Sequence, residues 1–228
     1  MKLRIKFAKT GVMKFIGHLD IMRYFQKAIR RAEIDIAYSG GFSPHQIMSF
    51  AAPLGVGIQS KGDYFDIEVH SITSCQDIRQ RLQAEMVEGM EILDVVELSE
   101  HSGNAMASVR AAAYRIMADK KECGTDWVSL FEEFISPASI IATKKTKKSE
   151  KEIDIKEFIY QVEIQEQAVV LLVNASSSGN ISPGFIMQIF AEKNAVLLKN
   201  TGWDITRLEL YGDKELNGSQ TLVPLAEL

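Results

Sequence analysis

Two kinds of apolar spacing alternate along the first 98 residues, and this alternation limits the possible fold more than any other feature. Residues 2–9 alternate apolar and basic side chains, which predicts a half-buried strand with a basic outer face. Residues 18–32 carry apolar side chains three and four positions apart, which predicts an amphipathic helix. Gly40, Gly41 and Pro44 then predict a break in regular structure.

The rest of the first half continues the pattern. The sequence predicts strands over residues 47–52, 64–69 and 90–98, and a helix over residues 75–86. The resulting order, β-α-β-β-α-β, is that of the ferredoxin-like motif, an antiparallel sheet with two helices on one face. We therefore predict one ferredoxin-like domain over residues 1–99, which carries the basic helix and a glycine-rich loop.

A similar order of elements follows a polar, glycine-containing segment at residues 100–108, which we interpret as a linker. The sequence predicts a helix over residues 127–134 and another that opens at Pro183, since proline is favourable in a first helical turn. Strands are predicted over residues 111–118, 140–145, 160–165, 169–173 and 204–211. The predicted fold class is α+β, with two ferredoxin-like halves in tandem, the second over residues 109–215.

Composition excludes several classes of protein. The chain has 228 residues, 46% hydrophobic and 25% charged, which is ordinary for a globular protein. No run of about 18 uncharged apolar residues occurs, and charges interrupt the N-terminus, so we expect no membrane segment, no signal peptide and a cytoplasmic location. Cys75 and Cys123 are too few to ligate an iron–sulfur cluster, which needs about four protein ligands. We predict no metal site and no cofactor.

Charge is distributed unevenly. Residues 1–60 hold nine Lys and Arg against three Asp and Glu, a net +6, whereas the remainder of the chain is net −10. One end of the protein is therefore expected to face an anion, although an uneven scatter of solvated charges would give the same count.

The basic residues of the first helix are its most informative feature. Arg23, Lys27, Arg30 and Arg31 follow a spacing that places them on one helical face, away from the apolar stripe. A row of cations along a helix is suited to a phosphate backbone. The alternative is a solvated face without a partner.

The loop after this helix is rich in glycine and contains two aromatic residues. It reads Tyr38-Ser39-Gly40-Gly41-Phe42-Ser43-Pro44-His45. Glycines allow successive backbone N–H groups to point into one concavity, which can hold an anion. The aromatic side chains could stack on a base. The alternative is a tight turn with Phe42 in the core.

Two residues near the start of the helix complete the candidate set. Asp20 is suited to the first turn of a helix, and His18 could pair with it or with a phosphate. We predict no catalytic residue. The predicted anion- or RNA-binding residues are Lys14, His18, Arg23, Lys27, Arg30, Arg31, Tyr38, Ser39, Gly40, Gly41, Phe42, Ser43 and His45.

Four short motifs carry a family resemblance. They are Lys14-Phe15-Ile16-Gly17-His18-Leu19-Asp20, Arg30-Arg31-Ala32, Gly41-Phe42-Ser43-Pro44-His45 and Pro53-Leu54-Gly55-Val56-Gly57. The chain resembles the radical SAM-linked protein family, strongly over residues 1–98 and weakly to about residue 210. The resemblance implies a radical SAM protein as partner, which would hold the cluster and perform the radical step.

Three hypotheses follow for function. The first is a non-catalytic accessory protein that grips RNA, or another phosphate-bearing substrate, for a radical SAM partner. The second is a metal-independent endoribonuclease with His18 or His45 as general base, which rests on analogy at the level of the fold. The third is a structural subunit whose basic helix docks on an acidic surface of the radical SAM protein.

Overall fold

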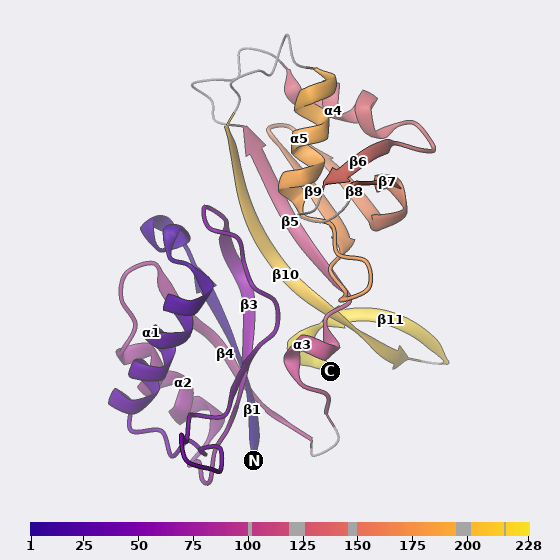
Figure 1. The fold of residues 1–228 in the computed structure, drawn as a ribbon. Coiled ribbons are helices and arrows are strands. Elements are labelled where there is room, and N and C mark those ends of the chain that lie inside the picture. The colour runs from indigo at the N-terminus through magenta and orange to yellow at the C-terminus, as the bar shows by residue number, and fades with distance from the viewer. Residues whose placement is uncertain (100–101, 119–125, 146–149, 195–201, 217) are drawn as a thin grey trace. The chain divides into compact units, whose positions relative to one another are not determined.

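The computed structural model describes the chain except residues 100–101, 119–125, 146–149, 195–201 and 217. The chain divides into two compact units, and Figure 1 shows their elements. Unit 1 comprises Met1–Arg110 and Arg207–Leu228, and unit 2 comprises Ala111–Thr206. The C-terminal residues thus belong with the N-terminal ones, whereas the ranges predicted from the sequence, 1–99 and 109–215, each follow the chain without interruption.

Unit 1 is built on a mostly antiparallel sheet with two longer helices and a short one. Its first elements are β1 (Lys2–Lys9), the 3-10 turn η1 (Gly11–Phe15), α1 (His18–Arg31), β2 (Met48–Phe50), β3 (Gln59–Glu68), α2 (Cys75–Ala84), β4 (Met90–Leu98) and α3 (Ala105–Ser108). The chain returns as β10 (Trp203–Leu216), β11 (Ser219–Pro224) and η3 (Leu225–Glu227). The strand order is β4-β1-β3-β10, with β2 paired to β3 and β11 paired to β10.

The alternation predicted for β1 decides which face of the sheet is the apolar core. Leu3, Ile5 and Phe7 are at most 2% exposed and pack in one cluster with side chains of α1 and α2. An aromatic group lies within it, in which the rings of Phe7 and Phe25 are 4.9 Å apart. This packing fixes α1 against the sheet and so sets the position of its polar face.

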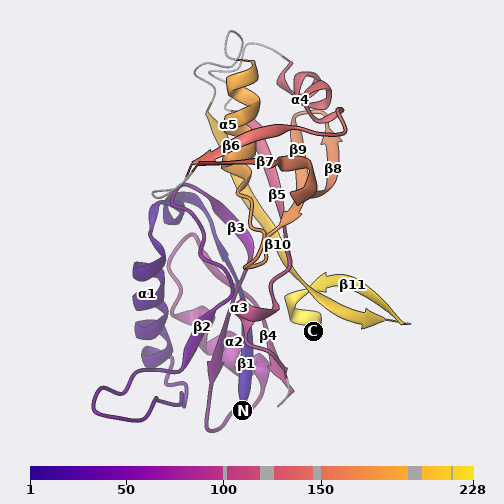
Figure 2. The same cartoon turned by 45° about the vertical axis from the view of Figure 1, so that its right-hand side comes forward.

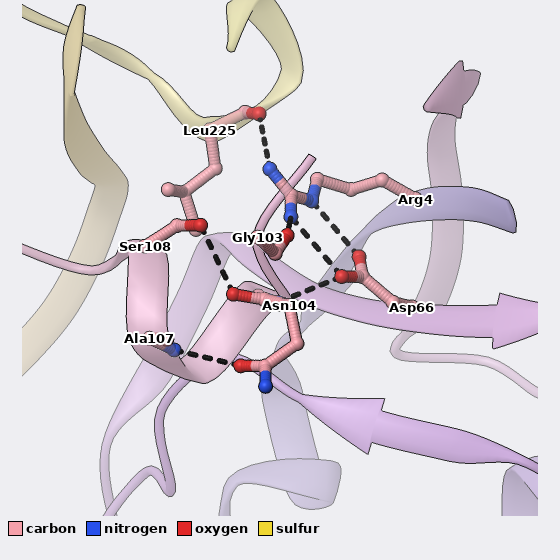
Figure 3. A network of polar contacts seen from close by, with 8 residues as sticks. Arg4, Asp66, Gly103, Asn104, Ala107, Ser108 and Leu225 are labelled. Atoms are coloured by element: carbon pink, nitrogen blue, oxygen red, sulfur yellow. Dashed lines mark hydrogen bonds and ion pairs between the residues drawn. The ribbon is translucent and has the colours of Figure 1, made fainter. Parts of the chain in front are cut away.

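The other face of β1 is not the solvated basic surface that the sequence predicts. Arg4 is 1% exposed, and its Nε and Nη2 donate to the Asp66 carboxylate at 2.8 and 3.0 Å (Figure 3). Its Nη1 donates to the Leu225 carbonyl at 2.9 Å. The prediction is wrong for Arg4 because Asp66 of β3, Leu225 of η3 and the Gly103 carbonyl supply partners for this guanidinium.

The segment interpreted as a linker is partly packed against the same ion pair. Residues 105–108 form α3, and the backbone N–H of Ala105 donates to Oδ2 of Asp66 at 2.7 Å. The Asn104 side chain caps α3 by accepting from the Ala107 N–H at 2.8 Å, as Figure 3 shows.

Unit 2 combines a three-stranded antiparallel sheet, in the order β5-β9-β8, with a separate hairpin. Its elements are β5 (Ala111–Ala118), α4 (Trp127–Ile135), β6 (Ile141–Lys145), β7 (Glu150–Asp154), η2 (Ile155–Phe158), β8 (Ile159–Gln165), β9 (Ala168–Asn174) and α5 (Pro183–Lys193). Phe131 of α4 and Phe190 of α5 pack with ring centroids 5.1 Å apart.

The prediction of mixed helices and mostly antiparallel strands is confirmed. The tandem ferredoxin-like arrangement stays a prediction. Over the described part of the chain, no helix has both the length and the apolar character needed to cross a membrane.

Candidate binding sites at the two ends of helix α1

Helix α1 separates the predicted site residues into two groups. It begins at His18, after the N-cap Gly17, and ends at Arg31. Fourteen residues at 1.5 Å per residue give a length of about 21 Å. Lys14 and His18 therefore lie at one end of the helix, and Arg30 and Arg31 lie at the other.

The four cations of α1 differ in their partners. Arg23 pairs with Asp20 at 3.1 Å on the same helix, and Arg31 pairs with Glu85 at 2.6 Å, just after α2. Lys27 and Arg30 are exposed, and neither has an ion pair within the described residues. Lys27 and Arg30 are thus the two cations of this face that a ligand can use without breaking an existing pair.

The glycine-rich loop is closed by its own backbone and projects an aromatic ring. The Ser39 N–H donates to the His45 carbonyl at 2.8 Å, and Oγ of Ser39 lies 2.9 Å from Nδ1 of His45. Gly41 has a φ of +97°, in the left-handed region that favours glycine. Phe42 is fully exposed, so the alternative that places it in the core is wrong.

One side chain ties this loop to α1. Nε2 of Gln46 donates to the backbone carbonyl of Gln26 at 3.2 Å. Gln46 is 6% exposed, and its Oε1 has no hydrogen-bond partner in the described part of the chain. Gln26 and Arg30 are four residues apart and so share a face of the helix. Gln46 thus holds the end of the loop against the C-terminal half of α1, and Figure 2 shows the loop near the C-terminal end of the helix.

At the other end of α1, two of the sequence motifs meet. The backbone N–H of Gly57 donates to the carbonyl of Lys14 at 2.8 Å, which joins the Pro53–Gly57 motif to the Lys14–Asp20 motif. The His18 ring packs edge-on against Phe50, with centroids 5.3 Å apart. These contacts gather residues that are more than thirty positions apart in the chain around the first turn of the helix.

A buried charged cluster lies behind this junction. It consists of Lys9, Asp63 and Arg207, which are 2%, 5% and 3% exposed. Nη1 of Arg207 is 2.6 Å from Oδ1 of Asp63, whereas Nζ of Lys9 has one hydrogen bond to the described residues, to the Ile16 carbonyl at 3.4 Å. Burial lowers the pKa of the Lys9 ammonium, against the raising effect of the Asp63 charge and with the lowering effect of the Arg207 charge.

Sequence reasoning missed Lys9 and Arg207. Arg207 also donates to the carbonyls of Ala52 and Pro53, at 3.2 and 3.4 Å, and so holds the start of the Pro53–Gly57 motif. The available signal was a charged residue within an alternating strand. That pattern ordinarily means a solvated side chain, so it gave no reason to expect burial.

The histidines and cysteines of the described residues do not form a metal centre. No group of three or more His, Cys, Asp or Glu side chains in this part of the chain is arranged to hold a metal ion. Cys75 is half-buried, and burial raises the pKa of its thiol. Cys123 lies outside the described residues.

Comparison with known proteins gives a family but no activity. None of the curated proteins matches this sequence. Among solved structures, a chain in the crystal structure of a Cbf5-Nop10-Gar1 complex is similar at a TM-score of 0.48, with 11% identity over 91% of this chain. The match covers 48% of that chain, about half its length. Residues 2–183 match a family described as "Uncharacterized protein conserved in bacteria (DUF2344)", and the chain belongs to this family.

Proposed function

We propose that unit 1 is a non-catalytic binding module that grips a phosphate-bearing macromolecule, RNA, at the C-terminal end of α1. Lys27 and Arg30 would contact phosphates, and the loop from Tyr38 to His45 would contact the neighbouring nucleotides. In this proposal Arg23 and Arg31 keep their carboxylate partners and lie beside the RNA-binding surface, which consists of Lys27, Arg30 and the loop from Tyr38 to His45.

The observation that carries the proposal is the coincidence of two features on one side of the helix. Two exposed cations without ion pairs in the described residues stand beside a loop that presents a fully exposed phenyl ring. Single-stranded nucleic acid is bound by this combination, since cations hold the backbone and aromatic rings stack on the bases.

A radical SAM protein is the proposed partner. The support is the resemblance described above, together with the presence of only two cysteines in the chain. A cluster of the radical SAM type needs more thiolate ligands than this chain offers, so the radical step would belong to the partner and the grip on the substrate to this protein.

The test is a salt titration of binding to a fluorescent single-stranded RNA. We expect Lys27→Ala combined with Arg30→Ala to weaken binding and to reduce the slope of log K against log salt by about 1.4, since each phosphate contact on a single strand contributes about 0.7. A control that removes the same charge elsewhere combines Lys61→Ala with Lys151→Ala, two exposed lysines. An unchanged slope in the α1 variant, or an equal change in the control, would overturn the proposal.

The alternative of an endoribonuclease receives no support from the two histidines. His18 opens α1 and packs on Phe50, while His45 is hydrogen-bonded to Ser39 within the loop. The loop is tethered to Gln26, two helical turns beyond His18. Cleavage of the RNA in the titration, in the presence of a chelator, would favour the enzyme hypothesis over a binding module.

A further inference from the structure

We propose that the N-terminal end of α1 holds a second binding site, in which the Lys9 ammonium takes the carboxylate or phosphate group of a ligand with an apolar body. The inference concerns the end of α1 opposite to the RNA-binding surface and does not depend on it.

Lys9 adds a buried positive charge beside the Arg207–Asp63 ion pair. Lys9 and Arg207 bring two cations into this cluster, and Asp63 brings one carboxylate. The carboxylate is bound by Arg207 at 2.6 Å, and the ion pairs within the described residues include none for Lys9. A buried charge is costly unless it is paired, so one negative charge beside the Lys9 ammonium would stabilise it.

The hydrogen bonding of the Lys9 amine is incomplete within the described residues. An ammonium has three donors, and Nζ of Lys9 uses one of them in a long bond of 3.4 Å to the Ile16 carbonyl. Burial lowers the pKa of Lys9 because water does not solvate the charge. An oxyanion at this position would supply both the missing acceptor and the missing charge.

A small cavity lies beside the Lys9 amine. It has a volume of about 10 Å³ and is lined by Lys9, His18 and Asp63 among apolar side chains from Phe7, Ile21, Phe50 and Leu54. A volume of this size holds about one water-sized group. A ligand could therefore insert a single oxygen next to Lys9, with the Asp63 charge already neutralised by Arg207, while the rest of the ligand stays outside.

The surface around this cavity carries exposed apolar side chains. Four large apolar side chains are exposed on the segments that meet here, at 62–77% of their full areas: Val12 and Phe15 of η1, Leu19 of α1 and Val56 of the Pro53–Gly57 motif. The Gly57–Lys14 hydrogen bond brings the last of these segments against η1. A cationic hole with an apolar rim is complementary to an anionic group on an apolar body.

The test compares acetate, hexanoate and inorganic phosphate as probes on the complete chain, with chloride used to keep ionic strength equal. Backbone amide NMR shifts of the wild-type protein report where each probe binds. We expect shifts at His18, Leu19 and Gly57, and we expect hexanoate to bind about ten-fold tighter than acetate, since each buried methylene favours binding. Tighter binding of phosphate than of hexanoate would identify a phosphate ligand, and the reverse a carboxylate ligand; either supports the site.

The variant Lys9→Met tests the role of the amine, because methionine keeps much of the length of the side chain and removes the charge. We expect it to raise the melting temperature in chloride buffer without the probes and to abolish the stabilisation that the probe gives to the wild type. Lys61→Met, at an exposed lysine, should respond as the wild type does. Absence of shifts at the α1 N-terminus up to millimolar probe, or an undiminished response of Lys9→Met, would overturn the proposal. Neither result would alter the salt dependence of RNA binding at Lys27 and Arg30.

Discussion

Arg207 and Asp63 are 144 residues apart in the chain, yet Nη1 of the first lies 2.6 Å from Oδ1 of the second in a nearly solvent-free ion pair. The pair joins β10 to β3, and the same guanidinium holds the carbonyls of Ala52 and Pro53. The geometry of the α1 N-terminal end therefore depends on a residue close to the end of this chain.

Replacing the carboxylate of this pair should be strongly destabilising. Asp63→Asn removes the buried carboxylate that pairs with Arg207 and whose charge acts on Lys9, and we expect a loss of about 3–5 kcal/mol in the free energy of unfolding, measured in urea. In the double variant with Lys9→Met, one uncompensated charge has gone, so the loss should be smaller than in Asp63→Asn alone. Equal losses of unfolding free energy in the single and double variants would show that Lys9 does not interact with the Asp63 carboxylate.

A glycine of β3 should resist substitution because of a close backbone approach. A Cβ added at Gly62 would lie 2.8 Å from the Cα of Glu209 and closer still to the Leu208 carbonyl oxygen, both of which are backbone atoms of β10. We expect Gly62→Ala to cost about 1–3 kcal/mol in urea unfolding, the usual range for overpacking. Gly40→Ala is the matched control, because nothing lies within 4 Å of its added Cβ, and it should cost far less.

The stability of unit 1 should decline in alkaline solution through Tyr64. Burial, then the hydrogen bond to the Glu209 carboxylate at 2.7 Å, raises the pKa of the Tyr64 hydroxyl. The unfolded chain loses this proton near pH 10 while the folded protein keeps it, so the stabilisation is complete below about pH 10 and is lost progressively as pH rises toward the folded pKa. Urea unfolding of Tyr64→Phe should show a shallower decline above pH 10 than the wild type. Parallel declines would contradict this assignment.

The exposed ring of the loop should contribute to binding and not to folding. Phe42→Ala should weaken binding of single-stranded RNA by about 1–3 kcal/mol, the range measured for base stacking, with the salt slope unchanged. Because Phe42 is fully exposed, the melting temperature of the Phe42→Ala variant should match that of the wild type. Val12→Ala, an exposed apolar residue at the other end of α1, serves as the control and should leave RNA affinity unchanged.

In unit 2, the start of α5 depends on a side-chain cap. Oγ of Ser182 accepts from the Phe185 N–H at 3.2 Å, and Pro183 follows in the first turn. Ser182→Ala should lower the free energy of unfolding by about 1 kcal/mol, the typical value for an N-cap. Ser177→Ala, in the exposed turn before α5, should change it by much less, and equal effects would argue against the cap.

The elements that could be predicted are those whose burial follows a regular period. The apolar stripe of residues 18–32 predicts α1 closely, and the alternation of residues 2–9 predicts β1. Strands β7 and β11 were not predicted. The first three residues of each are exposed, so their sequences carry little of the alternation that a half-buried strand leaves.

The candidate site could be predicted only where local chemistry is enough. Glycines, aromatics and exposed cations identify the loop and the surface of α1, since these features act within a few residues of one another. The buried positions of Arg4 and Arg207 could not be predicted, because their carboxylate partners, Asp66 and Asp63, lie 62 and 144 residues away in the chain. A charge in an alternating strand gives no sign of such a partner.

The position of Arg207 also affects how the protein is made. Unit 2 is encoded between the strands of unit 1, so a ribosome completes residues 111–206 before it adds the counter-ion of Asp63. The inserted unit is therefore synthesised while the Arg207–Asp63 ion pair of unit 1 cannot yet form. Chains that terminate early, just before Arg207, would contain every residue of both α1 surfaces and yet lack the strand that closes one of them.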